Sequence, residues 1–151
     1  MRRSVIIIAI FSFFVLSWRG VGYSLDRKEA IKQYLADVNP VLTNIQVTTR
    51  KVSQKLLPLN GAIEQIQSYV DSLHSLTPPD ALAKQHKMIL LSFKKIRLGF
   101  CELLRGDKQL SVTLVKRGAG LLKIAVVDIV ELGKKEGIIK ENSEQKNSVK
   151  P

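Results

Sequence analysis

The sequence has little of what most enzymes and disulfide-stabilised proteins depend on. Of its 151 residues, one is cysteine and two are histidine, and aromatic residues make up only 6%. A single cysteine, Cys101, excludes an internal disulfide, so the core must be held by packing. The sequence patterns of zinc proteases, phosphate-binding loops, dinucleotide-binding turns and covalent haem attachment are missing. The composition therefore argues against an enzyme, and we expect no cofactor.

Acidic residues are also scarce. There are 13 Asp and Glu against 24 Lys and Arg, which gives a formal net charge of +11. Such an excess favours an anionic partner or surface, although lysines scattered for solubility give the same count. Aromatic residues are not interleaved with the cations, which argues against nucleic-acid binding. We expect a protein or an anionic component of the cell envelope as partner, and a homo-oligomer is a further alternative.

The N-terminal 24 residues have the layout of a secretory signal peptide. Arg2 and Arg3 precede an apolar run over residues 4–18, and small residues suited to a signal peptidase follow as far as Ser24. This run would span about 22 Å as a helix, which is less than the roughly 30 Å of a bilayer core. We predict export to the periplasm or the extracellular space. The alternative is an uncleaved segment that anchors the protein in the membrane, which would be its only membrane contact.

Apolar residues recur every three or four positions in four later segments, which predicts an all-α protein. The first segment covers residues 26–57 and contains Pro40, which should kink the helix or break it in two. The second covers residues 60–76, with Asn60 as its N-cap, and is about half as long. The third and fourth, over residues 80–105 and 108–136, complete an antiparallel up-down four-helix bundle.

The turns between these segments carry the signals of helix ends. Pro78 and Pro79 forbid a continuous helix and should form a rigid corner. Gly106 suits the C-terminal end of the third helix, and Asp107 suits the N-cap of the fourth. The most apolar stretch, residues 121–130, should be a helix that is buried on most sides.

These boundaries divide the chain into three parts. Residues 1–24 are the predicted signal peptide, residues 25–137 the helical bundle domain, and residues 138–151 a disordered polar tail. The core should be lined by the apolar stripe of each helix. We expect Cys101 to be a small buried residue rather than a reactive thiol.

Both histidines flank the double-proline corner. His86 has a core position on the third segment, where a lone histidine is usually hydrogen-bonded to a neighbour. His74 lies three residues after Asp71, so the two side chains share a helix face. The corner should bring His74 and Asp71 near His86, and imidazole and carboxylate groups can ligate zinc or a similar ion. The alternative to a core histidine is therefore a metal- or small-ligand-binding periplasmic bundle.

A second candidate site is the outer side of the third segment. Leu91 and Leu98 are seven residues apart and lie opposite the buried stripe, so they should point away from the core. The lysines of the same segment are Lys84, Lys87, Lys94 and Lys95. The two leucines indicate a second contact surface, for another helix of the same bundle or for a partner chain.

The corner also carries a resemblance. Leu73-x-x-Leu76-x-Pro78-Pro79, followed by a histidine seven residues later, resembles a pattern in small exported bacterial helical proteins of unknown function. The resemblance covers about residues 62–104, and this chain lacks the lipobox cysteine that many such proteins carry. It implies a helical bundle in the cell envelope without known activity. We predict a non-enzymatic exported bundle that acts as a binding or scaffolding module of the envelope.

Overall fold

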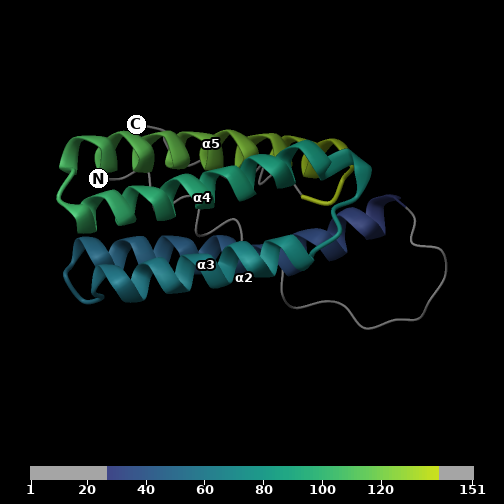
Figure 1. Cartoon of the computed structure of the whole chain (residues 1–151). Coiled ribbons are helices and arrows are strands. Elements are labelled where there is room, and N and C mark those ends of the chain that lie inside the picture. The colour runs from purple at the N-terminus through teal and green to yellow at the C-terminus, as the bar shows by residue number, and fades with distance from the viewer. Residues whose placement is uncertain (1–26, 140–151) are drawn as a thin grey trace, which may run out of the picture.

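The computed structural model describes residues 27–139, which form four α-helices that pack together and one short 3₁₀-helix (Figure 1). The elements are α2 Arg27–Ser53, α3 Leu59–Ser75, η1 Asp80–Leu82, α4 Ala83–Arg105 and α5 Lys108–Lys135. Residues 27–139 contain no strand, so the prediction of an all-α protein is confirmed. With 17 residues, α3 is the shortest of the four α-helices, as expected. The predicted signal peptide lies outside the described residues.

Consecutive helices pack against one another, and α4 and α5 make the most extensive contact. In Figure 1, α4 and α5 form one side of the molecule, and α2 and α3 form the other. The core between them is made of the stripes that the spacing predicts. On η1 and α4 the buried residues of the predicted stripe are Leu82, His86, Ile89, Phe93, Ile96 and Phe100.

The helix α2 contributes two polar side chains to the core that its apolar spacing does not reveal. Tyr34 is 3% exposed, and Thr48 is 2% exposed. The Thr48 hydroxyl bonds to Gln65 and Tyr69 of α3 at 3.0 and 3.1 Å. These bonds compensate the loss of water around a buried hydroxyl, so a polar residue is tolerated where α2 meets α3.

Three predicted helix ends are wrong by a few residues. The helix α2 ends at Ser53, not near Leu57, and a left-handed Lys55 (φ 57°) reverses the chain there. Pro58, not Asn60, is the N-cap of α3, where its carbonyl accepts a bond from the N–H of Ala62 at 3.1 Å and no side chain caps the helix. After the double proline the first turn is the 3₁₀-helix η1, and α4 begins only at Ala83.

The turn between α4 and α5 follows the prediction. Gly106 adopts the left-handed conformation (φ 94°), and its N–H and that of Asp107 bond back to the last carbonyls of α4. The Asp107 carboxylate accepts a bond from the N–H of Leu110 at 2.9 Å. Gly106 therefore ends α4, and the next residue, Asp107, caps the start of α5.

The packed domain extends slightly beyond its predicted end. Gly137 reverses the chain (φ 63°), and the N–H groups of Ile138 and Ile139 bond to the carbonyl of Gly133. Ile138 is 9% exposed and belongs to the core, and Ile139 packs against it. Two residues that polar composition assigned to the tail are therefore part of the bundle. The rest of the predicted tail lies outside the described residues.

The prediction that residues 121–130 are buried on most sides is wrong. Of this stretch only Ala125 and Ile129 are buried, whereas Ile124 and Val127 are 53% and 46% exposed. The reason is that α5 packs mainly on α4, so one side of it remains uncovered by the other described helices. The apolar residues of α5 therefore lie partly in the core and partly on the surface.

Candidate functional site

The helices α4 and α5 approach each other through a row of small residues that we call the seam. The seam consists of the buried residues Ser92, Gly99, Ser111, Gly118 and Ala125, spaced seven apart on each helix. A Cβ atom on Gly118 would lie 2.8 Å from the carbonyl oxygen of Ser92 and 2.7 Å from the Ile96 side chain. A Cβ atom on Gly99 would lie 2.6 Å from the Val115 side chain. The missing side chains therefore let the two helices pack closely as one unit.

The seam fixes which residues of α4 face away from the core. At about 100° per residue, the residue after each seam position turns to one side and the residue before it to the other. Phe93 and Phe100 follow seam residues and are buried. Leu91 and Leu98 precede the same seam residues, so they lie on the opposite side, where they are 46% and 44% exposed.

On α5 the rule holds at Ala125, since Val126 follows this seam residue and packs against the core. Val112 and Ala119, which follow the other two seam residues of α5, are exposed. Ile124 and Leu110 precede seam residues, and they are 53% and 43% exposed. The side of the α4–α5 pair that faces away from α2 and α3 therefore carries aliphatic side chains from both helices. We call this surface the outer face, defined by Lys84, Leu91, Leu98, Leu110, Arg117 and Ile124.

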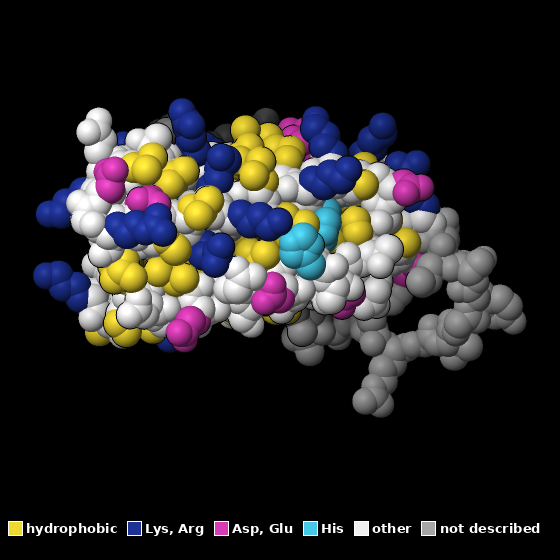
Figure 2. Space-filling model, in the orientation of Figure 1, with side chains coloured by type: hydrophobic (Ala, Val, Ile, Leu, Met, Phe, Trp, Pro, Cys, Tyr) yellow, Lys and Arg dark blue, Asp and Glu magenta, His cyan; other side chains and the backbone are white. Residues whose placement is uncertain are grey.

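All six residues predicted for a partner surface lie on or beside this outer face. Leu91, Leu98 and Lys84 belong to it. Lys87, Lys94 and Lys95 are three or four residues from one of the two leucines and share their side of α4. Lys87 and Lys94 are exposed, and Lys95 is half-buried. Figure 2 shows one side of the molecule, where Lys and Arg side chains lie among hydrophobic side chains.

The sequence prediction missed the residues that α5 contributes to this face. Leu110, Arg117 and Ile124 are spaced seven apart, as are the seam residues that follow them. A search for small residues at seven-residue spacing in both α4 and α5 would have found the seam. The outer face then consists of the residues that directly precede the seam residues, together with Lys84, which lies seven residues before Leu91.

His86 is a buried histidine with a partner on another helix. Its Nδ1 atom lies 2.8 Å from the hydroxyl oxygen of Tyr34 on α2, and the two rings meet edge to face. Burial lowers the pKa of His86, and its electrostatic interaction with His74 lowers it further. Burial also raises the pKa of the Tyr34 hydroxyl, which therefore stays protonated. The pair is a neutral hydrogen bond inside the bundle, as expected for a core histidine.

The three predicted metal ligands do not form a metal site. His74 and His86 lie close together, as their electrostatic interaction and Figure 2 show. The Asp71 carboxylate, however, accepts a bond from Gln67 on the exposed side of α3. Within residues 27–139 no group of three or more His, Cys, Asp and Glu side chains could hold a metal ion. Two histidines, one of them buried and bonded to Tyr34, are too few ligands.

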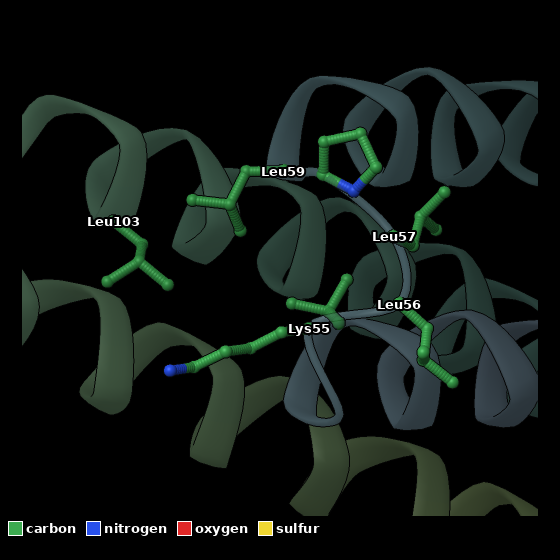
Figure 3. Close-up of a pocket in the computed structure, with 7 residues that line it drawn as sticks. Lys55, Leu56, Leu57, Leu59 and Leu103 are labelled. Carbon is green, nitrogen blue, oxygen red and sulfur yellow. The ribbon is translucent and has the colours of Figure 1, made fainter.

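A cleft of about 430 Å³ lies where the α2–α3 turn meets the end of α4. Leu59 and Leu103 point toward one another across it, and its other lining residues are Val52, Lys55, Leu56, Leu57 and Pro58 (Figure 3). Lys55 is the one charged side chain among these lining residues. A catalytic site for group transfer needs several titratable side chains that converge on the substrate, and this lining does not provide them.

Comparisons with known proteins find no protein-family model, no curated protein and no solved structure that matches the chain. The resemblance of the double-proline corner to small exported helical proteins thus stays a prediction. Among residues 27–139, no helix has the length and apolar character needed to cross a membrane.

Proposed function

We propose that the protein is a non-enzymatic binding or scaffolding module of the cell envelope, and that its outer face is the binding surface. One observation carries this proposal. Of the large hydrophobic side chains that residues 27–139 expose, all except Val47 and Leu56 belong to α4 and α5. Exposed apolar side chains that gather on one pair of helices are typical of an interaction site.

The chemistry of the described residues supports binding rather than catalysis. The half-buried Cys101 has no histidine near it on α4, since His86 is fifteen residues away, or about 22 Å along the helix. The buried Tyr34–His86 pair is not part of the cleft lining. These arrangements offer no activated nucleophile and no pair of acid and base groups around a substrate.

The envelope location rests on the N-terminal sequence. Arg2 and Arg3 with the apolar run over residues 4–18 direct the chain to export, and cleavage near Gly22 or Ser24 releases it into the periplasm or the medium. The intact mass of the protein recovered from its producing cells tests this. A mass that includes residues 1–24 would instead indicate an uncleaved anchor.

Two finer features of the bundle complete the proposal. The four helices alternate in direction, which the short connections between consecutive packed helices support. The helix α2 is one continuous helix that includes Pro40, so it is not broken in two, but it bends there because proline lacks the N–H for one helical bond. Distances between paired spin labels at the ends of α2 would lengthen in Pro40→Ala if the bend exists.

Photo-crosslinking in the producing cells tests the binding surface. A photoreactive phenylalanine analogue is placed at Leu98 or Ile124, and at Val47 as a matched control with similar exposure. We expect adducts with envelope components from the first two positions and few from the third. Equal yields from all three positions, or no adducts at Leu98 and Ile124, would contradict the proposed surface.

A further inference from the structure

We propose that the outer face docks on an anionic phospholipid surface. In this arrangement Leu91, Leu98, Leu110 and Ile124 enter the boundary between headgroups and acyl chains, and the surrounding cations meet the lipid phosphates. This inference rests on the proposed function and names the partner of the same face. It also goes beyond the expectation that any membrane contact would involve only the N-terminal segment.

The charge of the bundle is divided unequally between its two helical pairs. Residues 27–82 contain 6 Lys and Arg and 5 Asp and Glu, so they are nearly neutral. Residues 83–135, which include α4 and α5, contain 12 Lys and Arg against 4 Asp and Glu. The pair of helices that exposes the hydrophobic side chains is therefore also the cationic one.

The middle of the α4–α5 pair carries no negative charge. The four carboxylates lie toward its two ends: Glu102 and Asp107 near the turn, and Asp128 and Glu131 late in α5. Glu102 is already bound by Arg105 at 2.7 Å. Residues 84–101 and 108–127 hold nine Lys and Arg and no Asp or Glu. This central stretch, which includes the outer face, is complementary to a negatively charged surface.

The exposed side chains have the chemistry that a lipid interface accepts. They are aliphatic, they lie among cations, and they come from two helices that the seam holds side by side. Helices that lie in a membrane interface combine an apolar face with flanking Lys and Arg in this way. The aromatic residues of α4, Phe93 and Phe100, are buried, so this face has no stacking platform for nucleic-acid bases.

A second copy of the chain is a poorer occupant of the same face. If two outer faces met, Lys84, Arg117 and the neighbouring lysines of both copies would come together, and the stretches that carry this face, residues 84–101 and 108–127, hold no Asp or Glu to pair with them. Like charges brought into contact oppose association unless they are paired. A lipid surface that carries phosphates provides the missing opposite charge.

Site-specific fluorescence on the full chain tests the inference independently of any binding by the N-terminal segment. The environment-sensitive dye NBD is attached to a cysteine at Leu98→Cys, Ile124→Cys or, as control, Val47→Cys, each in a Cys101→Ala background. Vesicles of phosphatidylglycerol with phosphatidylcholine are compared with phosphatidylcholine alone. We expect emission at positions 98 and 124 to shift to shorter wavelength and to be protected from iodide, only with the anionic vesicles. Position 47 should not change.

The lysines provide a second, quantitative test. The first variant replaces Lys84, Lys87, Lys94 and Lys95 with Gln. Its apparent affinity for the anionic vesicles, measured from the signal at position 98 as the vesicle concentration rises, should be weaker by about fivefold per lysine. The matched control replaces Lys28, Arg50, Lys51 and Lys55 of the nearly neutral half and should have little effect. Raising the salt from 0.1 to 1 M should also weaken the signal, since the screening length falls from about 10 to about 3 Å.

The outcomes separate this inference from the proposed function. Labels at positions 98 and 124 that stay in water while the protein is bound to anionic vesicles would overturn lipid docking. If those labels stay in water but the photo-crosslinks at the same positions yield protein adducts, the face binds a protein and only the lipid inference fails. If neither experiment gives a signal at these positions, both proposals fail.

Discussion

The hydroxyl of Tyr34 and the Nδ1 atom of His86 are 2.8 Å apart, and this bond joins α2 to α4 in the interior of the bundle. With the imidazole proton on Nε2, Tyr34 donates the bond to Nδ1. Both residues are at most 6% exposed, so neither can exchange its partner for water without opening the bundle. The bond therefore connects the two sides of the molecule, and its state depends on whether His86 is neutral.

Mild acid should destabilise the protein through His86. Its pKa is lowered in the folded state by burial and by His74, so the unfolded chain takes up a proton more readily than the folded one. The contribution of neutral His86 is fully present above its ordinary pKa of about 6.5 and is lost as the pH falls below that value. Urea unfolding at pH 7.5 and at lower pH values measures the free energy of unfolding. His86→Gln should show a much smaller pH dependence between pH 7.5 and 5.

Removing the Tyr34 hydroxyl should be costly although the change is small. Tyr34→Phe keeps the ring in place but leaves Nδ1 of His86 buried without its partner. We expect the free energy of unfolding to fall by about 1–3 kcal/mol at pH 7.5. Tyr69→Phe is a useful comparison, since its hydroxyl meets Thr48, which also bonds to Gln65. If Tyr34→Phe lowers the free energy of unfolding by no more than Tyr69→Phe does, the Tyr34–His86 bond contributes little.

The four helices could be predicted because a buried stripe leaves a regular pattern in the sequence. On α4 the spacing of three and four identifies every buried residue from His86 to Phe100 except two, Ser92 and Gly99. These two are the seam residues of α4. Spacing of apolar residues cannot reveal them, because the property selected there is small size rather than hydrophobicity.

The candidate site could be predicted only in part for the same reason. Leu91 and Leu98 stand out because they lie off the buried stripe of α4. On α5 nearly every position between Leu121 and Val130 is apolar, so composition alone could not separate the buried Ala125 from the exposed Ile124. That distinction depends on where α4 contacts α5, which is a property of the tertiary structure. The partner of His86 was likewise hidden, since Tyr34 is 52 residues away in the chain.

Replacing Lys55 with glycine should stabilise the bundle. Lys55 is the one residue other than glycine among residues 27–139 with a positive φ, at 57°. Its backbone position is needed because it lets the N–H of Leu56 bond to the carbonyl of Lys51 at 2.8 Å. The left-handed conformation costs an L-residue roughly 1 kcal/mol, which glycine avoids. Thermal unfolding should show a higher midpoint for Lys55→Gly, whereas Lys51→Gly, inside the last turn of α2, should lower it.

Two glycines of α5 that are two residues apart should respond in opposite ways to alanine. A Cβ on Gly118 meets the Ser92 carbonyl oxygen at 2.8 Å, so the helices must move apart, whereas a Cβ on Gly120 meets nothing within 4 Å. We expect Gly118→Ala to lower the free energy of unfolding by about 1–3 kcal/mol. Gly120→Ala should raise it by about 0.5–1 kcal/mol, since alanine favours the helix. Urea titrations of both variants measure these changes. If both variants gain stability, α4 and α5 are not in close contact, and the outer face that the seam defines has no structural basis.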